Sequence, residues 1–232
     1  MTRWFSTLLL LSSAGAELDA AEREGAGAAR SEREDGAGRT AFSRLCSRKS
    51  RGTGKVRAWF DAHHPGCHQF ELGAWAGLLF PSPRHPFYAE GFTPEPLVVA
   101  SGSFGVQASY APLPEFGLEL GGGVIPTQTD ATRLHTMMYT TRAAVLLQAP
   151  LRLTPVALAG VALLSSSGPS LGAAVTPGAH LGLGLKLYAT EGLALRFELR
   201  DTVTEGAGGG LVHHPELLLG LTIVLERLGP GG

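Results

Sequence analysis

Eight ionisable residues of this chain have side-chain types and a spacing that could support ion pairing or ion passage. They occur at alternate positions within largely apolar segments, as in LALRFELRDTV at residues 193–203. Because four are acidic and four basic, they could pair inside a narrow interior and seal it, or line a gated passage. They are Glu71, Glu119, Glu198, Glu226, Arg142, Lys186, Arg196 and Arg200.

Other reactive side chains form no readable site. Serine residues 165–167, Asp201 and several histidines have the types found in hydrolase triads, but no spacing identifies a triad, which is defined by geometry. The HHPGCH segment of residues 63–68 has a turn at its centre, and no second ligand cluster accompanies it. We therefore predict that the protein is not an enzyme and has no catalytic residue, cofactor or metal site. The histidines considered were His135, His180, His213 and His214.

The ionisable residues belong to segments with a period of two, which predicts strands with one apolar and one polar face. Most segments have about 10–13 residues, the length of a tilted membrane strand. The fifth segment is apolar on both faces, so its periodicity is the weakest. The predicted strands are 69–80, 99–112, 116–125, 138–149, 156–165, 178–189, 193–203 and 216–228.

The predicted connections alternate between short and long. Short connections join the second strand to the third, the fourth to the fifth and the sixth to the seventh. Such short turns at one end and long loops at the other are typical of outer-membrane barrels, whose short turns face the periplasm together with both termini. The four long loops are predicted at residues 81–96, 126–136, 166–177 and 205–214.

Alternation alone leaves open which face points outward, because a soluble lipocalin-like carrier also alternates and turns its apolar face inward. The apolar faces lack charges through their middles, and aromatic side chains such as Tyr110 and Tyr139 lie near strand ends, as a lipid belt requires. The polar face is rich in glycine, which would leave room for long side chains in a lumen. We therefore predict an all-β, eight-stranded antiparallel up-and-down transmembrane β-barrel with a charged lumen. Its best local ion pair is Glu119 with Arg142, on neighbouring strands.

The segments outside the barrel have other compositions. Residues 1–16 combine Arg3, a short apolar run and an Ala-Gly-Ala end, a pattern typical of a signal peptide. Residues 17–68 are rich in small and charged residues and predict a disordered periplasmic segment. The barrel is assigned to residues 69–228 and a flexible tail to residues 229–232. Cys46 and Cys67 could pair in an oxidising compartment.

The strand segments resemble the small outer-membrane β-barrel family, like the transmembrane domain of outer-membrane protein A. The phrases FELGAWAGLLFP, LRFELRDTVT and ELLLGLTIVLERL are similar to myxobacterial-type outer-membrane β-barrel domain proteins. The resemblance covers about two thirds of the chain. It implies localisation in the cell outer membrane and insertion by the barrel-assembly machinery.

The leading functional prediction is an integral outer-membrane barrel with a salt-bridged, closed lumen and a structural or interaction role through its long loops. The alternatives are a narrow gated channel for ions or small solutes and, third, the soluble carrier. The expected partners are outer-membrane lipid and a loop partner whose identity the sequence does not reveal. A formal net charge of −1 gives no case for nucleic-acid binding, and a monomer is expected.

Overall fold

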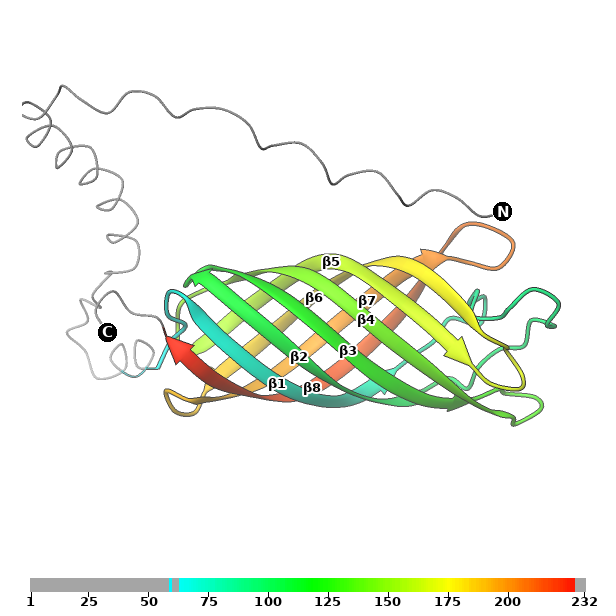
Figure 1. Cartoon of the computed structure of the whole chain (residues 1–232), viewed down its shortest axis with the longest axis horizontal. Helices are drawn as coiled ribbons and strands as arrows, with labels where there is room; N and C mark the ends of the chain where they lie inside the picture. The colour runs from blue at the N-terminus through cyan, green and yellow to red at the C-terminus, as the bar shows by residue number, and fades with distance from the viewer. Residues whose placement is uncertain (1–58, 60–62, 228–232) are drawn as a thin grey trace, which may run out of the picture. The chain divides into compact units, whose positions relative to one another are not determined.

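The computed structural model describes residue 59 and residues 63–227, which form one closed antiparallel β-barrel in which each strand pairs with the next and β8 closes on β1. Figure 1 shows the eight strands tilted around a common axis. The strands are β1 (Gln69–Leu79), β2 (Ser101–Leu113), β3 (Phe116–Gln128), β4 (His135–Gln148), β5 (Leu153–Ser167), β6 (Ala174–Tyr188), β7 (Leu193–Glu205) and β8 (Leu211–Arg227). The predicted fold class is confirmed.

The predicted orientation of the two strand faces is also confirmed. Large apolar side chains cover the outside, where Leu183 is 68 % exposed and Leu219 is 63 % exposed. The alternate positions point inward and are buried, among them Arg196 on β7 and Lys186 on β6. An apolar exterior is what a bilayer requires and the opposite of what water requires, so the structure excludes the soluble lipocalin-like alternative.

All four predicted long loops differ in length from the observed ones: the first is longer than predicted and the other three are shorter. The strands extend past their predicted ends, which leaves loops of residues 129–134, 168–173 and 206–210. Pro126 on β3 and Pro177 on β6, both predicted to lie in loops, are strand residues at positions where the strand pairs on one side only. Proline is tolerated at such edge positions because its missing N–H has no ladder partner there.

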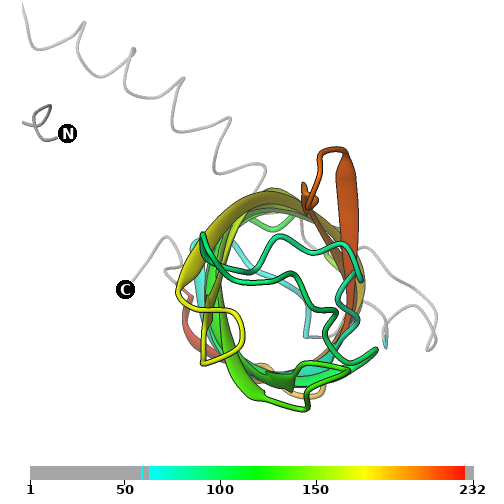
Figure 2. The same cartoon turned by 90° about the vertical axis from the view of Figure 1, so that its right-hand side faces the viewer.

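The remaining loop, residues 80–100 between β1 and β2, lies across the end of the barrel. Figure 2 looks onto this end and shows the loop crossing the opening. Its backbone bonds to all three other loops at this end: Ala89 N donates to Leu171 O at 2.7 Å, Asp130 N donates to Pro96 O at 2.8 Å, and Ala207 N donates to Arg84 O at 3.0 Å. The loop is therefore a strap over the opening.

The other end carries the three short connections, residues 114–115, 149–152 and 189–192. Trp59 stacks under the Arg152 guanidinium here, 4.6 Å from the ring centroid. The predicted signal peptide, Cys46 and the tail at 229–232 lie outside the described residues, as does most of the predicted disordered segment. Cys67 is disulfide-bonded.

Two further findings concern the described residues alone. None of their helices has the length and apolar character of a membrane-crossing helix. No three His, Cys, Asp or Glu side chains among them gather closely enough to hold a metal ion, the HHPGCH segment included.

Candidate functional site

The lumen holds a closed ring of four charged side chains, three from β7 and one from β3. Arg196 binds Glu119 and Glu198, each at 2.5 Å. Arg200 binds the same two carboxylates, each at 2.6 Å. Because Arg196, Glu198 and Arg200 alternate along one face of β7, the strand itself places a carboxylate between two guanidinium groups. Each charge in the ring therefore has two partners of opposite sign.

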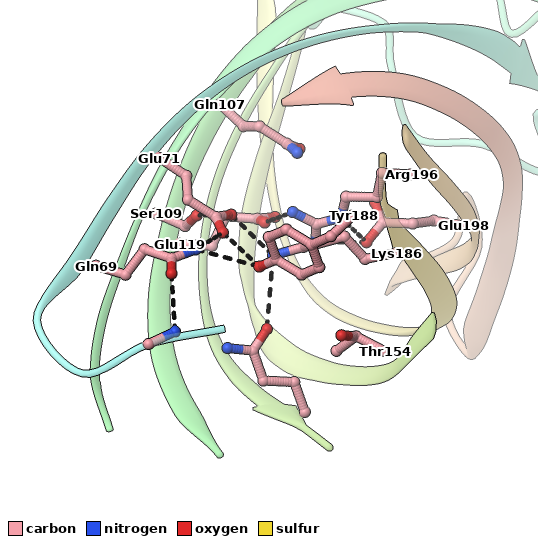
Figure 3. Close-up of polar contacts among 12 residues, drawn as sticks. Gln69, Glu71, Gln107, Ser109, Glu119, Thr154, Lys186, Tyr188, Arg196 and Glu198 are labelled. Atoms are coloured by element: carbon pink, nitrogen blue, oxygen red, sulfur yellow. Dashed lines mark hydrogen bonds and ion pairs between the residues drawn. The ribbon is translucent and has the colours of Figure 1, made fainter. Parts of the chain in front are cut away.

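A second cluster surrounds Glu71 of β1, nearer the short turns. Its carboxylate accepts hydrogen bonds from Lys186 Nζ at 2.8 Å, Tyr188 OH at 2.7 Å and Gln69 Nε2 at 2.5 Å. Ser109 Oγ donates a fourth bond at 3.2 Å. Figure 3 shows these groups converging on the carboxylate. The buried negative charge is thus both paired and fully hydrogen-bonded, as a buried charge must be to persist.

The third charged contact joins Arg142 of β4 to Glu216 of β8. The guanidinium carbon of Arg142 also lies 5.8 Å from the centroid of the Trp75 ring. Trp75 is an inward residue of β1 and 7 % exposed, so its ring fills part of the lumen. We call the three sets together the ion-pair layer.

In each of the three sets, at least one ion pair crosses the lumen: Glu119 with Arg196 and Arg200, Glu71 with Lys186, and Arg142 with Glu216. In a closed barrel of eight strands, β3 and β7 are diametrically opposed, as are β4 and β8, and β6 lies three strands from β1. Their side chains meet directly, so the interior is only as wide as the side chains that fill it. The ion-pair layer therefore bridges opposite walls.

The predicted pair of Glu119 with Arg142 does not form. The β3–β4 register sets Glu119 opposite Ala144 and Arg142 opposite Gly121, so the two charges are offset along the barrel. Each charge instead reaches across the lumen to the far wall. Adjacent pairing was expected because sequence shows strand neighbours but not the width of the lumen.

Seven of the eight predicted lumen residues lie in the ion-pair layer, and one acidic member was missed. Glu226 is in register with Phe70, but its side chain lies outside the described part of the chain. Glu216, 0 % exposed, was overlooked because it began the predicted eighth strand. Glu216 could have been identified from the sequence because it has the same parity on β8 as the inward residues Leu218 and Thr222.

The inward glycines make room for the long side chains, as predicted. A β-carbon on Gly123 would lie 2.6 Å from the Phe104 carbonyl oxygen and 2.6 Å from the Trp75 ring. A β-carbon on Gly184 would lie 2.6 Å from the Phe197 carbonyl oxygen. Glycine is required at both positions because neither backbone oxygen can move out of the way.

Water has almost no access to the ion-pair layer. The eight charged side chains of the layer are each at most 4 % exposed, although a water-filled channel would leave its lining accessible. The wall beside them is apolar at Leu146, Val156 and Leu158, where β4 faces β5. This inward apolar cluster explains why the fifth predicted strand was apolar on both faces. The lumen is closed at this level.

A second, apolar closure lies at the loop end. We call it the mouth cluster; its members are buried residues of four strands and two loops packed in one group, with Tyr88 against them. Phe87 and Leu97 come from the β1–β2 loop and the others from the wall and the β5–β6 loop. The members are Leu79, Phe87, Leu97, Ile125, Met138, Leu164 and Leu171.

Comparison with solved structures gives the same fold. Neisserial surface protein A matches with a TM-score of 0.52 and 14 % identity, over 67 % of this chain and 97 % of that one. The outer membrane protein OprG from Pseudomonas aeruginosa matches with a TM-score of 0.51 and 10 % identity, over 72 % of this chain and all 100 % of that one. No protein-family model matches the sequence, and no curated protein does.

The fold is that of the small eight-stranded outer-membrane β-barrels, as the resemblance implied. The apolar exterior and the buried ion-pair layer fit this class, in which lipid-facing and lumen-facing residues alternate.

Proposed function

We propose that the protein is an integral outer-membrane barrel that does not conduct, and that acts as a structural or interaction protein through its loop end. One observation carries the proposal: the ion-pair layer joins opposite walls, and its side chains are at most 4 % exposed. Charges so paired are costly to separate, because removing one member leaves the other buried and alone. Outer-membrane lipid and the barrel-assembly machinery are the partners this proposal implies.

The interaction role is supported by the surface of the loop end. Apolar side chains are exposed there on separate loops and strand starts: Val99 is 81 % exposed, Val175 68 % and Leu211 73 %. Apolar side chains exposed at the loop end are available for contact with a partner. The partner of this end is proposed to be a protein or lipid surface with apolar character.

Two measurements test the proposal. Cell fractionation with gel mobility before and after boiling should place the protein in the membrane fraction and show a heat-dependent shift. A protein found only in the soluble fraction, with no shift, would contradict the membrane assignment. Planar bilayers containing the refolded full chain should show no conductance steps at neutral pH, whereas regular steps would favour the gated-channel alternative.

A further inference from the structure

Two buried histidines flank Phe87 at the centre of the β1–β2 strap. His85 lies in the strap and is 2 % exposed; its ring stacks on Phe87 with centroids 5.2 Å apart and planes at 11°. His214 points inward from β8 and is 0 % exposed, with its ring centroid 4.9 Å from that of Phe87. Ser166 Oγ of β5 donates to the Phe87 carbonyl oxygen at 2.8 Å. Phe87 of the strap is thus held between two imidazole rings, and its carbonyl oxygen is bonded to β5.

The hydrogen bonds require both imidazoles to be neutral. His85 Nδ1 accepts the Phe87 N–H at 3.3 Å, and its Nε2 donates to the Glu95 carbonyl oxygen at 3.2 Å. His214 Nδ1 accepts the Ser82 N–H at 3.2 Å, and its Nε2 bonds Thr204 Oγ1 at 3.0 Å. An imidazolium carries a proton on both nitrogens, so neither Nδ1 could then accept. At each histidine, protonation would point the ring Nδ1–H at the backbone N–H that Nδ1 had accepted.

The strap has two carboxylates, the exposed Glu90 and the partly exposed Glu95, and neither side chain bonds His85 or His214. Against His85 lie the Phe87 and Tyr88 rings and the Arg84 and Glu95 backbones, while the Glu95 carboxylate is bound to Thr132. The groups around His214 are already engaged or are themselves basic. Glu216 is paired with Arg142. Asp201, on the outer face, is bound by His213 and by the His214 N–H. His180 of β6 is in register with Thr202, as His214 is from the other side.

We infer that the β1–β2 loop is an acid-released lid on the loop end of the barrel, held closed by the neutral Nδ1 atoms of His85 and His214. Acid would break the bonds to Ser82 and Phe87 together and place two like charges beside one phenyl ring. Phe87 would then leave the mouth cluster, and the strap would swing off the opening. The eight strands, whose ladders are independent of these nitrogens, would remain paired.

The direction with pH follows from burial. Burial lowers the pKa of His85 below its ordinary value of about 6.5, and the bond to the Glu95 carbonyl opposes this only in part. The closed state therefore has its full stability above that ordinary value and loses it as the pH falls through the lowered pKa. The lid is closed at neutral pH and opens in acid.

Hydrogen exchange of the refolded full chain, followed between about pH 8 and about pH 4 and corrected for intrinsic rates, tests the lid. Protection of the Ser82 and Phe87 amides should fall about tenfold per pH unit for each histidine that must stay neutral, from the ordinary histidine pKa down to the lowered one. Amides in the middle of β3 and β7 should keep their protection. Nitrogen NMR of the rings should show neutral imidazoles protonated at Nε2 above the transition and imidazolium below it.

Matched variants separate the lid from general acid effects. Asn offers an amide oxygen where Nδ1 accepted and cannot be protonated, so the double variant His85→Asn/His214→Asn should keep the strap protected in acid. His213→Asn changes the neighbouring, exposed histidine and should leave the acid release intact. Unchanged protection in acid, release that persists in the double variant, or simultaneous loss of strand protection would each overturn the inference.

Discussion

The lumen changes character along the barrel, from the ion-pair layer near the short turns to the mouth cluster under the β1–β2 loop. The ion-pair layer is built from side chains of strands, whose positions are fixed by two neighbours each. The mouth cluster takes Phe87 and Leu97 from a loop. Charges need fixed geometry because an orphaned buried charge is costly, whereas apolar contacts have no direction and tolerate a movable partner. We therefore expect the ion-pair layer to stay closed and the mouth cluster to be the closure that can open.

The largest effect is expected in the ion-pair layer. Glu119→Gln removes a carboxylate shared by Arg196 and Arg200, so it should lower the free energy of unfolding by about 3–5 kcal/mol. Denaturant unfolding in detergent micelles measures it. Glu205→Gln, at the exposed end of β7, is the matched control and should change little. Equal effects of the two substitutions would mean that the layer does not stabilise the barrel.

Substitutions in the mouth cluster should cost different amounts of stability, depending on whether the residue lies on a strand or in the β1–β2 loop. Leu164→Ala on β5 should cost about 2–5 kcal/mol, as for a buried strand residue. Phe87→Ala should cost the barrel less than about 1 kcal/mol, because the loop can detach locally while the strands stay folded. Unfolding curves together with hydrogen exchange of residues 82–98 check both. A Phe87→Ala cost as large as that of Leu164→Ala would make the strap part of the barrel core.

Adjacent glycines sharpen the argument for a filled lumen. Gly123→Ala should destabilise by about 1–3 kcal/mol, because its β-carbon would meet backbone and the Trp75 ring. Gly122→Ala faces outward and meets only the Thr140 carbonyl oxygen at 3.5 Å, an ordinary contact. The same unfolding assay compares them. If both changes were neutral, the lumen would have more room than the packing indicates.

The smallest effect is expected at the outer edge of the strap. Bonds from the Thr132 N–H and hydroxyl lower the pKa of the Glu95 carboxyl. The stabilisation that these bonds give to the outer edge of the strap is therefore present above the ordinary glutamate pKa and is lost as the pH falls through the lowered value. Glu95→Gln should loosen only residues 129–134 in hydrogen exchange. It should leave the unfolding midpoint of the barrel unchanged, and a shifted midpoint would contradict a local role.

The barrel could be predicted from the sequence because alternation survives in almost every strand. Leu195 and Arg196 show the reason: successive side chains point to opposite faces, and lipid and lumen demand opposite chemistry. The partners of the charges could not be predicted, since Arg142 meets Glu216 through the lumen and no local pattern encodes a contact between opposite walls. The strap was also beyond prediction, because its polar anchors depend on where His85 and His214 meet in space.

The central claim is that ion pairs spanning the lumen hold it shut, and a double-mutant cycle on Arg142 and Glu216 tests it most directly. Single changes to Met and Gln, and the double change, are compared by unfolding free energy. The account predicts a coupling of about 1–3 kcal/mol for Arg142 with Glu216, and less than about 0.5 kcal/mol for Arg142 with Glu119, which do not pair. Additive losses at Arg142 and Glu216 would contradict it.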